Sequence, residues 1–231
     1  MNRSASRAVV TAGVALATVL VILGIGVAVL FNPPFVAFEQ GRAGSTAFTG
    51  YTQDEVRTAT DAILGDLYFG GDFAVTVRGA QVLDAREQAH MRDVRGVFAG
   101  FFVAVLLSGF GLLVAGWRSR GAPWFWRAAR SGAIALAVGV VVLGVVSLVA
   151  FDALFEAFHE IFFAGGTYLF DPRSERLVQL FPDQFWSETS IVLAVILLGL
   201  ARLVAVIGRR RGTPVAEAGP KPPIGAVEAV R

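Results

Sequence analysis

The sequence contains no cysteine and only two histidines, His90 and His159, among its 231 residues. Without cysteine the chain has no disulfide, no thiolate nucleophile, no cysteine-ligated metal and no lipid-modified cysteine of its own. Histidine is the side chain whose unperturbed pKa allows proton transfer near neutral pH. Chemistry near neutral pH therefore depends on these two residues and the carboxylates beside them.

Charge is missing from long stretches of the chain. Three apolar runs contain no charged residue, and the only charged residue of a fourth is Arg202, near its end. Each run has about the 20 residues that cross a hydrocarbon core of ~30 Å. The first run is too long for a signal-peptide core and lacks a clear cleavage site, so we expect it to be retained. The sequence therefore predicts four transmembrane helices, at residues 8–31, 96–117, 131–151 and 189–208.

The charges outside these runs predict the orientation in the membrane. Four arginines and no acid lie in the second loop, at residues 118–130, and Arg209, Arg210 and Arg211 follow the fourth run. Placing both termini and this loop inside leaves 12 bases and 2 acids in the cytoplasm, against 8 bases and 16 acids outside. Positive charge collects on the cytoplasmic side of membrane proteins. We therefore expect a multi-pass protein of a plasma membrane, with both termini inside.

Polar groups are also scarce within the four runs, where Thr11, Thr18, Ser108 and Ser147 are the main examples. Transporters and channels need charges or broken helices near the midplane, so transport is not indicated. The sequence pI is about 9.5, but the bases lie beside the membrane, where they interact with anionic lipid. We expect contact with membrane lipid, no nucleic-acid partner and no obligate protein partner. Function is expected at the outer face.

The two outer segments, residues 32–95 and 152–188, are expected to form a small α+β cap. Thr52 and Glu55 have capping-box spacing and begin a predicted helix, which two glycines at residues 70–71 end. Alternation over residues 73–77 predicts a short strand, and residues 168–180 resemble a hairpin. The fold class predicted is thus an all-α membrane protein, a four-helix bundle with an α+β extracytoplasmic cap. The tail at residues 209–231 is expected to be disordered.

Both histidines follow carboxylates at helical spacing. Glu87, His90 and Asp93 share one helical side, and Glu156 precedes His159 by three residues. A carboxylate near an imidazole can fix its tautomer and stabilise the imidazolium. The alternative is a pair of interfacial histidines without a catalytic role, in a structural or accessory membrane protein. Arg92 and Tyr168 are weaker candidates for supporting residues.

The same residues also form two Glu-x-x-His pairs, as in di-iron carboxylate bundles. Glu39 and Glu188 lie near the outer ends of the first and fourth runs and would complete such a site. However, both pairs lie at helix ends rather than within a bundle. We therefore favour a site without a metal or another cofactor, and the metal-binding protein is kept as the less favoured alternative.

Taken together, the motifs resemble one family, the lipoprotein intramolecular transacylases (Lit) of bacterial membranes. The resemblance covers nearly all the chain except the tail. It rests on three motifs and a downstream pattern: Tyr51-Thr-x-x-Glu55, Glu87-x-x-His90-Met-x-Asp93-Val94, Phe158-His159-x-Ile-Phe-Phe163, and the Asp171-Pro172, Leu180-Phe-Pro182 and Phe185-Trp186 elements.

The resemblance implies four spans, an outer cap and two essential histidines, here His90 and His159. It also implies an enzyme, an acyltransferase, whose substrate is the diacylglyceryl-modified N-terminal cysteine of a lipoprotein. The sn-2 acyl chain would move to the α-amino group and leave a lyso-form lipoprotein. Glu87, Arg92, Asp93, Glu156 and Tyr168 would support the histidines at the outer leaflet.

Overall fold

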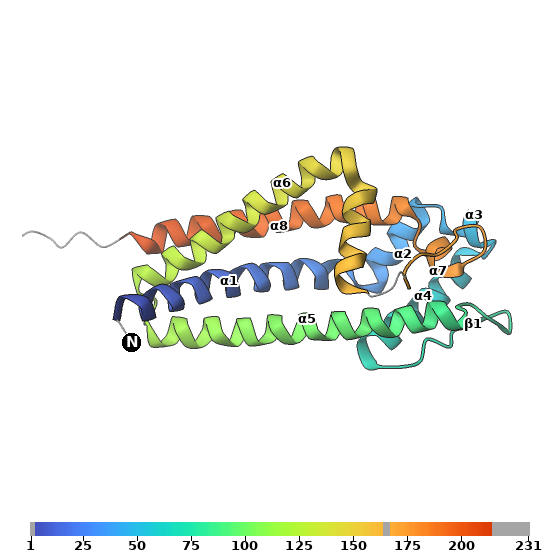
Figure 1. The fold of residues 1–231 in the computed structure, drawn as a ribbon, viewed down its shortest axis with the longest axis horizontal. Coiled ribbons are helices and arrows are strands. Elements are labelled where there is room, and N and C mark those ends of the chain that lie inside the picture. Colours follow the sequence, from blue (N-terminus) through green and yellow to red (C-terminus); the bar gives the residue numbers. More distant parts are fainter. Residues whose placement is uncertain (1–2, 164–166, 214–231) are drawn as a thin grey trace, which may run out of the picture.

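The computed structural model describes residues 3–163 and 167–213, in which four long helices form a bundle with a cap at one end (Figure 1). These four helices, α1, α5, α6 and α8, are long and apolar enough to cross a membrane. This confirms the predicted fold class. The elements in order are α1 (Arg3–Leu30), α2 (Pro33–Arg42), α3 (Ser45–Thr49), α4 (Gln53–Phe69), β1 (Thr76–Val77), β2 (Ala80–Gln81), α5 (Ala85–Arg118), α6 (Pro123–Phe162), α7 (Arg176–Leu180) and α8 (Asp183–Gly212).

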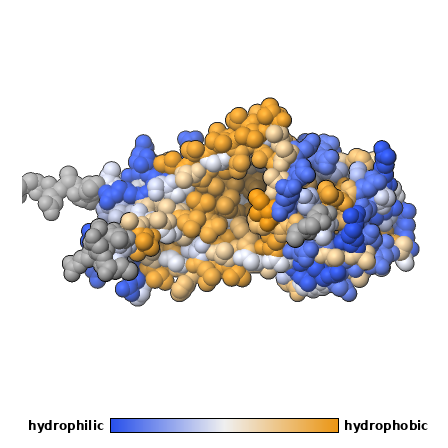
Figure 2. Space-filling model, in the orientation of Figure 1, coloured by the Kyte–Doolittle hydropathy of each residue, from blue (hydrophilic) through white to orange (hydrophobic). Residues whose placement is uncertain are grey.

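On the face shown in Figure 2, the surface of the bundle is mostly apolar and the surface of the cap is mostly polar. Val149 is 88% exposed and Leu113 is 74% exposed, which is costly in water and favourable in lipid. The chain is thus an integral membrane protein. Inside the bundle, Gly132 of α6 lies against the backbone of α1, since a Cβ there would be 2.2 Å from the carbonyl oxygen of Ala15.

Helix α6 bends sharply near its cap end (Figure 1). Ala150 has non-helical angles, φ −145° and ψ 39°, and one turn earlier the Ser147 hydroxyl donates to the Gly144 carbonyl at 2.9 Å. A glycine and a back-bonding serine are common at helix bends. Beyond the bend, residues 151–162 form an arm that crosses the bundle beside the cap. The arm carries His159.

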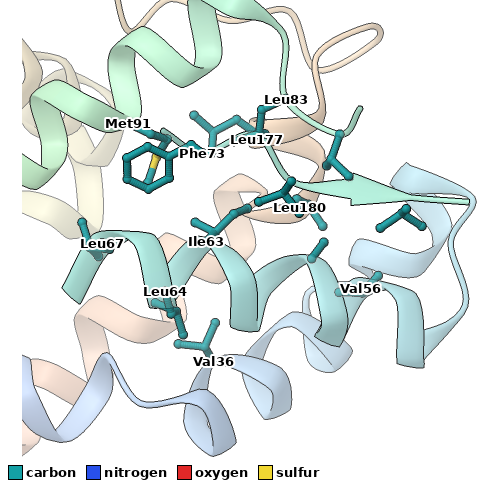
Figure 3. Packing of buried hydrophobic residues seen from close by; sticks show 14 of the residues in the cluster. Val36, Val56, Ile63, Leu64, Leu67, Phe73, Leu83, Met91, Leu177 and Leu180 are labelled. Carbon is teal, nitrogen blue, oxygen red and sulfur yellow. The ribbon is translucent and has the colours of Figure 1, made fainter. Parts of the chain in front are cut away.

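The cap has its own hydrophobic core, which joins α2, α4, α5 and α7 (Figure 3). Phe73, Leu83 and Leu180 are fully buried there, and Ile63 is 1% exposed. Helix α4 contributes one face because its apolar residues recur at helical spacing. Its N-terminus has the predicted capping box between Thr52 and Glu55. Met91, one residue after His90, also packs in this core, so the core fixes the cap end of α5.

A buried polar network joins the two segments that form the cap. The Gln40 amide donates to Thr60 Oγ1 and to the Leu180 carbonyl, each at 2.9 Å, and the Ser45 hydroxyl donates to the same carbonyl at 2.9 Å. Gln40 and Ser45 are fully buried. Because Gln40 and Ser45 lie in the 32–95 segment and Leu180 lies in the 152–188 segment, these bonds connect the two segments.

The strand region is a very small hairpin. Thr76 pairs with Gln81 and Val77 with Ala80. The two central residues of the turn have positive φ, 54° at Arg78 and 75° at Gly79, as a type I′ turn requires. The strand predicted over residues 73–77 is therefore shorter in the structure, since Phe73 has a φ of 61°.

The hairpin predicted over residues 168–180 is wrong. Asp171 instead begins a turn, in which its carbonyl accepts from the Glu175 N–H at 2.9 Å, and α7 follows directly. The Leu177 N–H donates to a Glu87 carboxylate oxygen and not to another strand. Helices α2 and α3 were not predicted at all. The disordered tail predicted from residue 209 is wrong for residues 209–212, which form the last turn of α8. The Gly165-Gly166 break and the tail beyond residue 213 lie outside the described residues.

Candidate active site

The two histidines lie face to face at the junction of the bundle and the cap. His90 is in the second turn of α5, and His159 is near the end of the α6 arm. Their ring centroids are 6.3 Å apart and the ring planes differ by 26°. Residues 69 positions apart in the sequence are thus adjacent. The bend at Ala150 and the start of α5 position them.

His90 is buried among aromatic rings. It is 5% exposed, and the rings of Phe163 and Phe170 meet it edge-on, with centroids 4.8 Å and 5.4 Å away. Its Nδ1 atom is buried and has no hydrogen-bond partner within residues 3–163 and 167–213. A buried polar atom without a partner is uncommon and requires an explanation. A substrate group or an ordered water is the simplest partner for it.

His159 has one ring nitrogen engaged by the backbone. Its Nδ1 lies 2.7 Å from the carbonyl oxygen of Phe155, one helical turn earlier. A carbonyl can only accept, so Nδ1 carries the proton in this contact. The neutral ring then has its lone pair on Nε2. Phe155 and Tyr168 flank the ring, with centroids 4.2 Å and 5.0 Å away.

The carboxylates predicted to orient the imidazoles do not bond to either ring. Glu87 is 2% exposed, and it accepts from the Leu177 N–H at 2.6 Å and from the Asp84 N–H at 2.7 Å. Asp93 and Glu156 are exposed. Among the described residues, neither ring has a carboxylate within hydrogen-bond or ion-pair distance. The expected carboxylate–imidazole pairing is thus corrected: a backbone carbonyl orients His159, and Glu87 joins α5 to the third loop.

An arginine that the sequence analysis did not select holds the same loop. Arg86 pairs with Glu175, donates to the Leu169 carbonyl at 2.8 Å, and lies over the ring of Phe170 at 4.7 Å. It thereby fixes the aromatic ring that covers His90. No local motif distinguishes Arg86 from its neighbours, because all its partners are more than 80 residues away. Arg92, which was selected, is exposed, and its nearest polar contact is the Asp72 carbonyl at 3.5 Å.

The carboxylates considered for a di-metal site form a separate pair. Arg42 lies 2.8 Å from Glu188 and 3.8 Å from Glu39. Burial, together with a hydrogen bond to Glu188, raises the pKa of Glu39 to about 7. Within residues 3–163 and 167–213, no group of three or more histidine, aspartate or glutamate side chains is arranged to hold a metal ion. The two Glu-x-x-His pairs therefore do not assemble with Glu39 and Glu188 into one carboxylate cage.

Comparison with known sequences identifies the family. The family model for the lipoprotein intramolecular transacylase Lit matches residues 10–186. The chain belongs to this family. The matched region contains both histidines, the α6 arm and the described cap residues up to 186. A search of curated proteins found no match.

The fold is that of a solved Lit protein. The chain is similar to the membrane integral lipoprotein intramolecular transacylase Lit from Bacillus cereus, with a TM-score of 0.78 and 16% sequence identity over 90% of this chain and 97% of that one. Two structures of the Bacillus protein with one histidine replaced, by arginine or by alanine, each give a TM-score of 0.73. At 16% identity the likeness establishes the shared Lit fold.

Proposed function

We propose that this chain is an intramolecular O-to-N transacylase, which moves the sn-2 acyl chain of a diacylglyceryl-cysteine to the α-amino group of the same cysteine. Membership of the Lit family supports a lipoprotein-modifying acyltransferase. The observation that carries the finer proposal is the meeting of His90 and His159, with ring centroids 6.3 Å apart, where the apolar bundle joins the polar cap.

The position of the pair suits a lipid-anchored substrate. The arm that carries His159 lies where the apolar surface of the bundle meets the polar surface of the cap (Figure 2). A diacylglyceryl-cysteine has its acyl chains in the hydrocarbon and its ester groups and amine at the interface. With the predicted topology, the two histidines are at the outer leaflet. The reacting atoms can therefore reach them while the chains stay in lipid.

We assign His159 as the base. Because its Nδ1–H is held by the Phe155 carbonyl, the Nε2 lone pair is available to accept a proton. The neutral α-amine attacks the ester carbonyl carbon and forms a tetrahedral intermediate. Nε2 of His159 then takes one N–H proton as that nitrogen becomes positively charged.

We assign His90 as the group that acts on the leaving oxygen. When the intermediate collapses, the bond between the acyl carbon and the sn-2 glyceryl oxygen breaks. That oxygen takes up a proton, so one amine proton is lost, one hydroxyl proton is gained, and an amide and an alcohol result. His90, facing His159 across the site, supplies this proton or a hydrogen bond to the oxyanion. Tyr168 beside His159 is a further donor for the oxyanion.

Much of the expected rate enhancement comes from positioning the amine at the ester carbonyl. Direct attack closes a ring of eight atoms, from the α-nitrogen through the thioether and glyceryl carbons to the acyl carbon, and such rings close poorly in solution. Holding the reacting atoms about 3–3.5 Å apart removes much of that entropic barrier. The aromatic rings of Phe163 and Phe170 against His90 provide rigid walls for this purpose.

The test is production of lyso-form lipoprotein in a host that makes only diacyl lipoproteins, followed by mass spectrometry of the modified N-terminal peptide. His159→Asn retains an amide N–H near the Phe155 carbonyl but lacks Nε2, and His90→Ala removes the second ring. Each is expected to reduce the lyso-form by roughly 10²–10⁴-fold. Glu160→Gln, an exposed neighbour of His159, is the matched control and is expected to retain activity.

Normal yield from either histidine variant, in a protein that still inserts in the membrane, would contradict the assignment of that histidine. Absence of the lyso-form from the unmutated chain would favour the accessory-protein alternative. Stoichiometric iron, manganese or zinc in the purified protein would instead favour the metal-binding alternative.

A further inference from the structure

A groove lies at the opposite end of the bundle from the histidines, between α1 and α5. Its wider part has a volume of about 570 Å³ and is bounded by Val10 of α1, Gly111 of α5, and Trp124 at the start of α6. A narrower part of about 210 Å³ shares Val10 and Gly111 and continues to Ala17. On α5, Arg118 is 28 residues from His90, or about 42 Å at the helical rise. The groove is therefore separate from the proposed active site.

Glycine leaves this groove open. A Cβ at Gly13 or at Gly111 would meet no atom within 4 Å, so each glycine borders empty space and is not needed for helix contact. The lining is otherwise mainly apolar. Apolar side chains beside an empty gap lose dispersion contacts, and in a bilayer an acyl chain can fill such a gap.

Charge indicates which lipid fits. The groove opens beside Arg118 and Ser119, and Arg118 forms no hydrogen bond or ion pair within the described part of the chain. Arg120, Arg127 and Arg130 lie in the same segment, which has no acid between residues 118 and 130. Trp117, 79% exposed, and Trp124 are typical of a membrane interface. A phosphate headgroup complements this end, and the predicted topology places it in the cytoplasmic leaflet.

The size of the groove also fits one acyl chain. From Arg118 to Gly111 the helix rises about 10 Å. One leaflet of hydrocarbon is about 15 Å thick, half of the full core. The groove thus covers most of one leaflet, from the headgroup level inward. We propose that it binds an anionic phospholipid of the cytoplasmic leaflet, with one acyl chain along Gly13 and Gly111 and the phosphate against Arg118 and the Ser119 hydroxyl.

The proposal is tested by native mass spectrometry of the full-length protein, titrated with phosphatidylglycerol or with phosphatidylcholine of the same chains. We expect one tightly bound phosphatidylglycerol, with about fivefold weaker binding of phosphatidylcholine, whose choline cancels the phosphate charge; this is the factor expected for one arginine beside a headgroup of net negative charge. Gly111→Leu should fill the groove and abolish this binding. Arg118→Gln should keep a bound lipid but remove the preference for phosphatidylglycerol.

The matched control is Gly139→Leu in α6, where a Cβ also meets nothing within 4 Å and which does not line the groove. It should bind phosphatidylglycerol like the unmutated chain. Equal binding of the two lipids, or undiminished binding in Gly111→Leu, would overturn the proposal. Dimers that Gly111→Leu dissociates would overturn it as well, because the groove would then hold a second copy of the chain. The test uses no transacylase readout, so its outcome is independent of the proposed function.

Discussion

At His159, the group that holds the imidazole is the backbone carbonyl of Phe155, whose own ring packs 4.2 Å from the histidine ring. A carboxylate would stabilise the imidazolium by charge, whereas a carbonyl fixes the tautomer with a smaller electrostatic effect. His159 therefore keeps a directed Nε2 lone pair without a negative charge bonded to its ring. Such a charge would be expensive beside the hydrocarbon.

Glu87 is the residue whose structural role can be separated most clearly from catalysis. We predict that Glu87→Gln lowers the free energy of unfolding by about 1–3 kcal/mol, because its amide N–H₂ would face one of the two backbone N–H groups that the carboxylate now accepts from. Loosening the third loop should also reduce lyso-form yield several-fold. Thermal unfolding in detergent and the peptide mass assay measure the two effects.

Asp84→Asn is the control for this prediction, since asparagine is as good an N-cap as aspartate and leaves the same helix start capped. Asp84→Asn should change the free energy of unfolding and the lyso-form yield only slightly. If Glu87→Gln is as stable and as active as the unmutated chain, the link between α5 and the third loop does not support the site.

Among the elements, α1 and α6 are in close backbone contact at Gly132. We predict that Gly132→Ala is destabilising by about 1–3 kcal/mol, because the new methyl group would meet the backbone of Ala15, which cannot rotate away. Gly139→Ala, seven residues further along α6, meets no atom within 4 Å and should leave stability unchanged or slightly raised. The prediction is tested by comparing the melting temperatures of the two variants in the same detergent. Equal values would contradict it.

The start of α4 should be sensitive to acid. A hydrogen bond from Arg78, supported by the Thr52 backbone N–H, lowers the pKa of Glu55 from 4.5 to about 2. Between these values the unfolded chain binds more protons at this site than the folded chain, so the stability from Glu55 is present above pH 4.5 and is lost as the pH falls towards 2. Glu55→Gln should therefore lower the melting temperature at pH 7 and have less effect at pH 3.

An exposed carboxylate on the same helix provides the comparison. Asp61 has only a 3.7 Å contact with Arg57, and Asp61→Asn should change the melting temperature at pH 7 much less than Glu55→Gln. A Glu55→Gln effect that is as large at pH 3 as at pH 7 would show that hydrogen-bond geometry, and not ionisation, matters at this helix start.

For the whole molecule, the charge distribution predicts the orientation. The cap with both histidines should be outside, and the end that carries Arg118 should be in the cytoplasm, because 12 of the 20 bases lie on that side with 2 of the 18 acids. Reporter fusions after Arg120 and after Arg173 should respond as cytoplasmic and external, respectively. A cytoplasmic response after Arg173 would remove the histidines from the outer leaflet and contradict the proposed substrate. Reporters fused within the fourth span, before and after Arg202, serve as controls for membrane insertion of that span.

The sequence by itself determined the four spanning helices, the capping box at Thr52 and the two histidines as the leading candidates. Apolar runs of membrane length and helix-capping residues at fixed spacing are local patterns. They can be recognised without knowledge of the fold, because their physical causes act within one segment. The Lit resemblance depended on equally local motifs. The helix-period pattern of residues 56–67 likewise gave α4 and the face that it buries.

Only the tertiary structure decided what surrounds the histidines and how the third loop folds. Arg86 and Glu87 act on residues more than 80 positions away, and the bend at Ala150 turns the arm across the bundle. Residues 168–180 form a turn and a helix rather than a hairpin, because the Ser174 and Glu175 N–H groups donate to the Asp171 carbonyl and the Leu177 N–H donates to Glu87 of α5. Partners such as Glu87 come from distant segments, and no local spacing in the sequence encodes them.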